Sequence, residues 1–253
     1  IAHRLSAVKQ ADRVGTFPDE DIALVRARDI SGLIPAEVGD AESLRVGDDG
    51  VAIVRMDLPG EPMNTLKADF VDTFTSVFAE VENDPEIKAA VFTSGKKDSF
   101  IAGADITAFT SVKDTGQAMA FLRRGQEVFN RLEALPFPTV ALIHGFCLGG
   151  GTELSLACRY RVTRDDPGTR MGLPEVKLGI HPGWGGSARM VPLIGGIKAM
   201  DLILSGRSID GRTGKRMGLV DLVVPERHLR AAARKLVLEK PAPYQAGWLD
   251  RLS

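Results

Sequence analysis

Short apolar segments that alternate with helix-period segments restrict the possible fold of this chain more than any other sequence feature. Residues 51–56 and 89–92 are apolar runs of strand length. Between them, residues 66–81 place apolar side chains at helical spacing. Strands joined by a helix pair in parallel, because the crossover returns the chain to the end of the sheet where the first strand began. The pattern therefore predicts an α/β fold with parallel strands.

The same pattern continues along the chain and defines the other expected elements. We expect Asn64 or Thr65 to cap the first helix and Pro85 to end it. Further strands are expected at residues 139–143, 160–163 and 219–224, and further helices at residues 115–134, 150–158, 197–205, 210–217 and 226–239.

Residues 1–46 lack this pattern, since acids, glycines and short apolar groups follow one another there without a sustained period. We therefore expect an N-terminal extension over residues 1–46 and one domain over residues 47–253, with a helical C-terminal part at 195–253. The sequence starts at Ile1 rather than at a methionine, which is typical of a fragment.

Composition disfavours several classes of function. Of the 253 residues, 44% are hydrophobic, so the chain can bury a core. Lys and Arg number 32 against 33 Asp and Glu, a balance that disfavours nucleic acid and anionic membranes as partners. No apolar run is long enough for a membrane span, and no signal peptide is evident. Two cysteines and four histidines lack metal-ligand spacing, so we expect a cytoplasmic protein without a metal.

Two segments match motifs of other protein classes. Residues 1–14 resemble the switch-histidine region of ABC transporter ATPases, but the chain has no phosphate-binding G-x-x-x-x-G-K-[ST] loop. Residues 183–188 satisfy the dinucleotide pattern G-x-G-x-x-[GA], which requires a strand that runs directly into the loop. His181-Pro182 precedes the loop and Pro192 follows it, so we reject dinucleotide binding. We reject the ATPase assignment because the phosphate-binding loop is missing from the sequence.

Three consecutive glycines, at positions 149–151, precede the predicted helix at 150–158. A helix start without side chains exposes free backbone N–H groups, which attract negative charge. Close packing against another backbone explains the same glycines equally well. Glu153 lies in the first turn of this helix, and Glu175 follows a break at Pro174. Two carboxylates beside such a helix start could move protons on a carbon next to a carbonyl group.

Several ordered motifs resemble those of the crotonase (enoyl-CoA hydratase/isomerase) superfamily. They are Gly60 to Leu66, Phe100 to Ile106, Ile143 to Glu153, Gly172 to Gly186 and Gly218 to Pro225. The resemblance covers residues 47–253 and is closest to the N-terminal hydratase domain of multifunctional fatty-acid oxidation complex α subunits. It implies a crotonase-like spiral of ββα units with a helical C-terminal region.

The resemblance also implies roles for individual residues. Glu153 and Glu175 correspond to the two catalytic carboxylates, and the backbone N–H groups of Ala104 and Gly150 to the oxyanion hole. We expect structural roles for His144, His181 and Trp184; the alternative for His181 and Trp184 is that they shape the acyl pocket. The implied substrate-binding positions are Ala102, Gly103, Asp105, Ile106, Gly149 and Gly183, of which Gly183 would help to hold the catalytic water.

The activity implied by the resemblance is hydration of trans-2-enoyl-CoA in fatty-acid β-oxidation. A double-bond isomerase is the alternative activity, and a truncated, non-catalytic crotonase-fold subunit is the alternative class. Coenzyme A would enter as part of the substrate, and no other cofactor is expected. Further partners would be two more copies of the chain in a homotrimer, or a thiolase in a fatty-acid oxidation complex.

Overall fold

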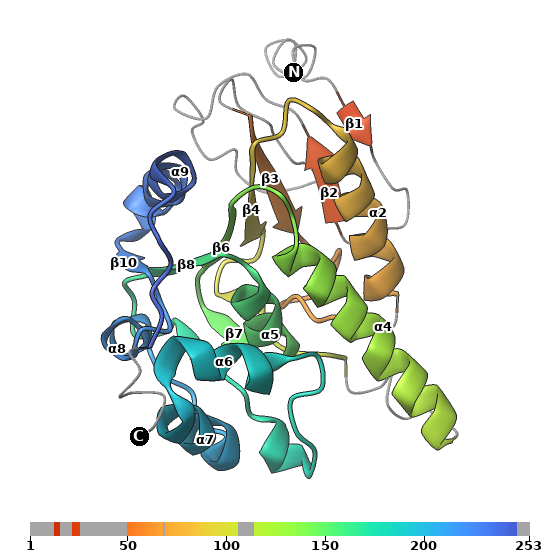
Figure 1. Ribbon diagram of the computed structural model, residues 1–253, viewed down its shortest axis with the longest axis vertical. Coiled ribbons are helices and arrows are strands. Elements are labelled where there is room, and N and C mark those ends of the chain that lie inside the picture. The colour runs from red at the N-terminus through yellow and green to blue at the C-terminus, as the bar shows by residue number, and fades with distance from the viewer. Residues whose placement is uncertain (1–12, 16–21, 26–49, 68, 106–113, 247–253) are drawn as a thin grey trace.

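Two β-sheets form the framework of the molecule (Figure 1). The computed structural model describes residues 13–15, 22–25, 50–67, 69–105 and 114–246. The larger sheet has the strand order β1-β2-β3-β4-β6-β8-β10, and the smaller sheet has the order β5-β7-β9. Residues 1–12 of the ATPase-like motif at 1–14, and the predicted site residue Ile106, lie outside the described residues.

The larger sheet is parallel from β3 to β10, which confirms the predicted α/β fold. The two strands from the N-terminal segment, β1 and β2, extend it in antiparallel pairing beside β3. Its strands are β1 (Arg13–Gly15), β2 (Ile22–Val25), β3 (Val51–Met56), β4 (Ala89–Ser94), β6 (Thr139–Ile143), β8 (Tyr160–Arg164) and β10 (Leu222–Val224).

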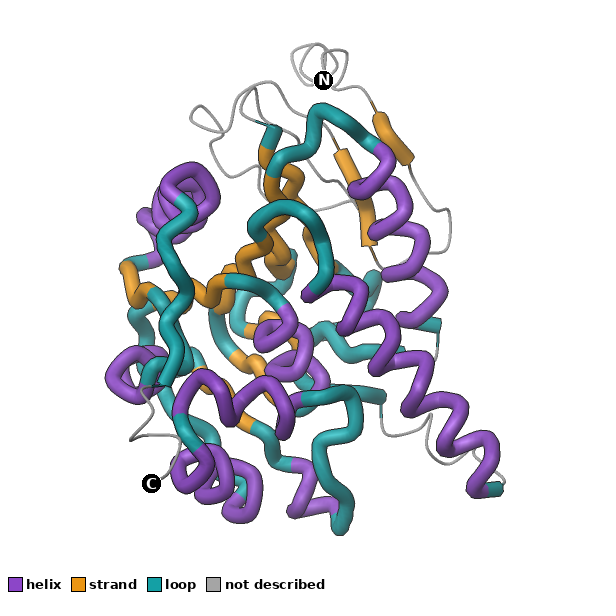
Figure 2. Tube along the Cα trace, in the orientation of Figure 1, coloured by secondary structure: helices purple, strands orange, loops and turns teal. Residues whose placement is uncertain are grey.

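Helices cover both faces of the central strands, so successive side chains of one strand enter different cores. One core lies beneath α2 (Phe70–Asn83) and α4 (Thr115–Glu133), which run side by side in Figure 2, and the other lies beneath α9 (Leu229–Glu239). The first core takes Ala90, Phe92, Ala141 and Ile143, and the second takes Ala89, Val91, Val140 and Leu142.

The smaller sheet was not predicted. It consists of β5 (Ser99–Ile101), β7 (Phe146–Leu148) and β9 (Arg170–Gly172), all parallel. Three residues are too few to show a sequence period, so these strands can be recognised only from their partners. They carry the buried helix α5 (Gly150–Ala157), which was predicted at this position.

The C-terminal part is mostly helical, as predicted. A third core lies among its helices, between Leu173, Met190, Ala199, Leu202 and Leu219. Two elements that precede this part, α6 and the short helix η1, were not predicted as such. The elements are η1 (Glu175–Leu178), α6 (Gly186–Ile194), α7 (Gly196–Ser205), α8 (Gly211–Met217) and η2 (Glu226–His228).

The predicted start of the first helix was wrong. The helix α2 begins at Phe70, and Asn64 does not cap it. The Asn64 side-chain amide instead accepts from Leu58 N–H at 2.9 Å and donates to the carbonyl oxygens of Met56 at 2.9 Å and Phe100 at 3.1 Å. Asn64 therefore joins the end of β3 to β5, a tertiary role that its sequence neighbours do not reveal.

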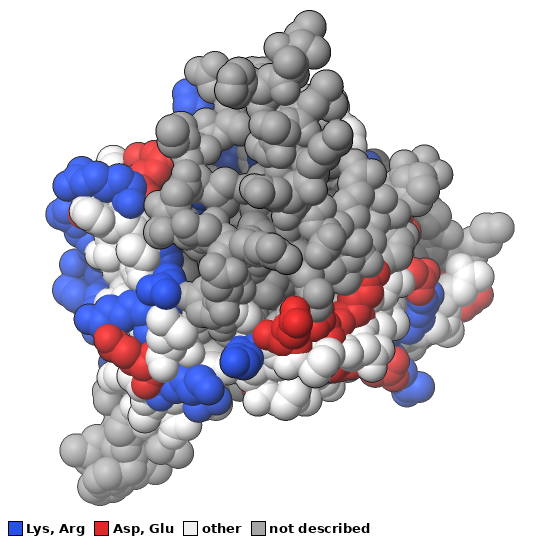
Figure 3. Space-filling model, turned by 90° about the horizontal axis from the view of Figure 1, so that it is seen from above, with Lys and Arg blue, Asp and Glu red and all other residues white. Residues whose placement is uncertain are grey.

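The molecular surface carries a local excess of positive charge despite the balanced composition. Figure 3 shows Lys and Arg side chains gathered on the side of the molecule where α9 lies. The exposed face of this helix carries Arg230, Arg234 and Lys235. Among the described helices, none is both long and apolar enough to cross a membrane.

Candidate active site

The turn that leads into α5 is held between two strands of the smaller sheet. Gly149 has φ 52° and ψ −124°, a backbone conformation that favours glycine. Its N–H donates to the carbonyl oxygen of Gly172 in β9 at 2.9 Å. The Thr152 hydroxyl lies 2.6 Å from the carbonyl oxygen of Cys147 in β7 and 2.8 Å from that of Gly172. The start of α5 is thus fixed from both sides.

The other two glycines of the run are required by close packing. A Cβ atom on Gly151 would lie 2.4 Å from the carbonyl oxygen of Ile101, and one on Gly150 would lie 2.7 Å from the Trp184 ring. Packing therefore explains two of the three glycines. The helix start is buried but still offers a free donor, because the N–H of Gly150 has no acceptor among the described residues.

Glu153 is buried in the first turn of α5, with an exposed fraction of 2%. Its Oε1 accepts hydrogen bonds from the backbone N–H groups of Trp184 at 2.8 Å and Gly186 at 2.9 Å. Burial raises the pKa of Glu153, whereas these two hydrogen bonds and the charges of Arg189 and His181 lower it. Burial has the largest effect, so the pKa of Glu153 is raised overall, and the two N–H donors offset only part of the cost of burying the carboxylate.

Glu175 begins η1 and is also buried, but it lacks the two donors that Glu153 has. It is 9% exposed, and its Oε2 has no hydrogen-bond partner among the described residues. Burial, with a smaller contribution from the charge of Glu153, raises the pKa of Glu175 to about 7. Its Oε1 lies 3.3 Å from the position that a Cβ on Gly149 would take. Both carboxylates thus converge at the start of α5.

The segment from Gly103 to Asp105 runs beside this helix start. Leu66 N–H donates to the carbonyl oxygen of Gly103, and Asp105 N–H donates to that of Leu66, both at 2.9 Å. In such a parallel bridge the N–H of Ala104 faces away from Leu66. The Gly103 Cα lies 3.6 Å from the Cβ position of Gly149, so Ala104 and Gly150 are neighbours in space.

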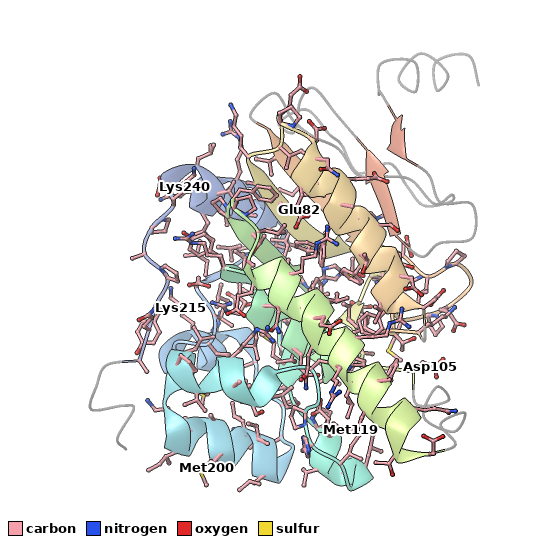
Figure 4. All side chains as sticks on the ribbon, turned by 45° about the vertical axis from the view of Figure 1, so that its right-hand side comes forward. Glu82, Asp105, Met119, Met200, Lys215 and Lys240 are labelled. Carbon is pink, nitrogen blue, oxygen red and sulfur yellow. The ribbon has the colours of Figure 1, made fainter. Side chains whose placement is uncertain are left out.

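The remaining substrate-binding positions of the prediction lie at the edges of this site. Ala102 directly follows β5 and is half-buried. Figure 4 labels Asp105 at the end of the molecule where α2 and α4 begin. Gly183 is half-buried beside Trp184, and its carbonyl oxygen accepts from Gln126 Nε2 at 2.7 Å.

Sequence reasoning missed the backbone donors that hold Glu153. They lie in the segment Trp184–Gly186, which was considered for dinucleotide binding and for packing. The signal was present, because Gly185 and Gly186 lie at the start of a helix, as the glycines at 149–151 do. The Trp184 ring packs as expected, with ring centroids 4.7 Å from Phe70 and 5.9 Å from Phe129.

His144, Cys147 and Cys158 make no hydrogen bond to either carboxylate among the described residues. His144 follows β6, and its Nε2 is 2.6 Å from the carbonyl oxygen of Lys96. Burial is the main cause that lowers the pKa of His144. Cys147 and Cys158 are buried free thiols. Within the described part of the chain, no three His, Cys, Asp or Glu side chains are grouped as a metal site.

Fold and site together define the chain as an α/β protein of the crotonase fold, with a pair of buried carboxylates beside a helix start. Residues 47–243 match the family profile "Enoyl-CoA hydratase/isomerase". The chain belongs to this family.

Solved structures and curated relatives agree with that assignment. The enoyl-CoA hydratase of Bacillus anthracis superposes with a TM-score of 0.71 at 27% identity, over 87% of this chain and 76% of that chain. A Geobacillus kaustophilus enoyl-CoA hydratase gives 0.71 at 30% identity, over 76% and 71%. The fatty acid oxidation complex subunit alpha of Shewanella putrefaciens is 50% identical over 197 residues, which are 78% of this chain and 28% of the relative. The chain thus spans about a quarter of the length of such relatives.

Proposed function

We propose that the chain catalyses the addition of water to trans-2-enoyl-CoA thioesters in fatty-acid β-oxidation. The observation that carries this proposal is the contrast between two neighbouring buried carboxylates. Burial raises the pKa of both carboxyl groups, to about 7 for Glu175, but the backbone N–H groups of Trp184 and Gly186 donate to Glu153 and stabilise its ionised form. Near neutral pH such a pair supplies a base and an acid within one site, which hydration requires.

The proposed reaction begins with polarisation of the thioester carbonyl by the N–H groups of Ala104 and Gly150. One oxyanion-hole donor is typically worth about 2.7–4 kcal/mol of transition-state stabilisation. Glu153 removes a proton from water as the water oxygen bonds to the β-carbon. Glu175 then gives its proton to the α-carbon, so that H and OH are added across the double bond. The proton on Glu153 returns to Glu175, directly or through solvent, before the next turnover.

The other predicted positions would serve the substrate in this scheme. Gly183 would help to hold the attacking water. The segment after β5 and the helix start would line the path of the thioester arm through Ala102, Gly103, Asp105, Ile106 and Gly149.

Replacement of either glutamate tests the proposal. We expect Glu153→Gln and Glu175→Gln each to lower the hydration of crotonyl-CoA by roughly 100- to 10,000-fold, because each removes one proton-transfer group. Loss of the conjugated-enoyl absorbance measures the rate, and circular dichroism checks the fold. Glu127→Gln, at an exposed position of α4, is the matched control and should keep the wild-type rate. Near-normal turnover in either site variant contradicts the assignment.

The same assay separates the alternatives. Isomerase activity would be measured as conversion of a 3-enoyl-CoA. Because an isomerase needs only one proton carrier, this activity would survive one of the two replacements. A folded wild-type chain that leaves the enoyl absorbance unchanged would favour the non-catalytic, truncated subunit.

We also propose that the chain associates with other subunits, as a homotrimer or with a thiolase. The support is an exposed apolar face on α7, where Ile197, Met200 and Leu204 are 65%, 58% and 66% exposed. Figure 4 labels Met200 on the outer surface of this helix. Exposed apolar surface of this kind marks interaction sites. Sedimentation velocity of the chain, alone and with a thiolase, distinguishes the two assemblies.

A further inference from the structure

Arg189, near the start of α6, connects the segment that holds Glu153 to a neighbouring helix. Its side chain is 8% exposed. Its Nη1 donates to the carbonyl oxygen of Trp184 at 3.0 Å. On the other side, its Nε donates to Glu133 Oε2 at 2.9 Å and its Nη2 donates to Asn130 Oδ1 at 2.6 Å, both in α4. The guanidinium therefore bridges α4 and the Trp184–Gly186 segment.

The Trp184 carbonyl group, which accepts from Arg189, lies next to both donors to Glu153. The carbonyl of Trp184 lies in sequence between the two N–H groups, of Trp184 and Gly186, that donate to Glu153. Gly185 has φ 100°, and a Cβ on it would lie 2.3 Å from Arg189 Nη1. The guanidinium thus fills the space that a side chain at position 185 would need. Movement of Arg189 would release the peptide group that lies between the two donors.

We propose that Arg189 is a positioning residue, whose guanidinium fixes the Trp184–Gly186 backbone so that two N–H groups hold the Glu153 carboxylate. The inference rests on the proposed function, because that function requires Glu153 to act as a base. A planar guanidinium suits this role, since it can donate in three directions from a rigid frame. Arg189 makes no contact with Glu153 itself and acts through the backbone and through its charge.

The charged groups around Glu153 come from several elements. Arg189 lies on α6, His181 on the segment before it and Glu175 on η1, while Glu133 on α4 neutralises part of the Arg189 charge. Loss of Arg189 removes a positive charge and loosens two hydrogen-bond donors. Both changes favour the protonated form of Glu153, so its titration should move to higher pH.

Kinetics of three variants test this role. We expect Arg189→Gln to lower kcat by up to about 100-fold, with KM almost unchanged, since the base is misplaced and partly protonated. The acid limb of the pH profile of kcat should move to higher pH. Arg189→Lys should restore the acid limb and only part of kcat, because an ammonium keeps the charge but not the planar fork. Arg131→Gln is the control, since it breaks a similar pair between α4 and Glu82 of α2 without contact to the site.

A direct titration separates this inference from the proposed function. NMR of 13C-carboxyl-labelled glutamate, with the Glu153 signal assigned from Glu153→Gln, should show a higher midpoint in Arg189→Gln than in the wild type. This result does not depend on any catalytic activity. Should Arg189→Gln fail to fold, Asn130→Ala removes one neutral anchor and should move the midpoint in the same direction. An unchanged Glu153 midpoint in the folded variant, or kinetics equal to those of Arg131→Gln, overturns the assignment.

Discussion

Glu153 and Glu175 have the same side chain, and the surrounding backbone makes them chemically different. Glu153 Oε1 receives two N–H donors, whereas Glu175 Oε2 receives none from the described residues. Hydrogen bonds stabilise an ionised carboxylate, and burial without them stabilises the protonated form. Burial raises the pKa of both carboxyl groups, so the difference between them lies in their hydrogen-bond donors, which depend on position and not on residue type.

This difference predicts the pH dependence of hydration. Glu175 must be protonated to act as the acid, and it loses its proton as the pH rises through about 7. We therefore expect kcat/KM for crotonyl-CoA to fall above this pH, and to fall again at acidic pH as Glu153 becomes protonated. A pH–rate profile measures both limbs. A rate that stays constant well above about pH 7, or residual Glu175→Gln activity with the same alkaline limb, contradicts the role of Glu175.

At the scale of elements, the site depends on close contact between α5 and the smaller sheet. The backbone of α5 at Gly151 lies directly against β5, where the carbonyl oxygen of Ile101 leaves no room for a Cβ atom. This contact holds the helix start beside the segment after β5, and it therefore brings Gly150 close to Ala104. A change in helix depth of a few tenths of an ångström would alter the geometry of the proposed oxyanion hole.

We expect Gly151→Ala to lower the free energy of unfolding by about 1–3 kcal/mol, because the new methyl group overlaps backbone rather than a movable side chain. Urea denaturation measures the change. Gly196→Ala is the matched control, since it also lies at the start of a helix, α7, and a Cβ there meets no atom within 4 Å. The control should change the free energy of unfolding by less than about 0.5 kcal/mol. Equal effects of the two changes would show that the contact with Ile101 is not tight.

At the scale of the whole molecule, a buried arginine joins the site to the C-terminal part. Arg161 in β8 is 1% exposed. Its guanidinium donates to the carbonyl oxygens of Cys158, at the end of α5, and Leu219, both at 2.8 Å. It also pairs with Asp221 at 3.2 Å, directly before β10. The helix that carries Glu153 is thus connected to the last strand of the larger sheet.

We expect Asp221→Ala to lower the free energy of unfolding by about 3–5 kcal/mol, because it leaves a buried positive charge without its partner. Asp201→Ala is the control, since its pair with Arg207 is about half exposed on both sides. Such a surface pair contributes about 0–1 kcal/mol. Thermal and chemical denaturation of both variants give the comparison. A loss in Asp221→Ala no larger than that of the control would exclude this connection as a source of stability.

The sequence by itself determined the elements whose signal is local. The strand β3 and the helix α4 repeat their apolar residues over enough positions to show a period, and the glycines before Glu153 mark a helix start. The family motifs at Glu153 and Glu175 could also be recognised, although the roles of these residues stay a proposal. The division into residues 1–46 and 47–253 stays a prediction.

Only the tertiary structure decided the rest, because it depends on residues far apart in the chain. The three-residue strands of the smaller sheet exist through their pairing with one another. Asn64 resembles a helix cap in the sequence, and distant carbonyl groups make it a bridge between strands. The different environments of the two carboxylates, and the contact of Arg189 with the Trp184 carbonyl, arise from burial and from hydrogen bonds across the fold. Such long-range contacts have no period and no fixed spacing in the sequence.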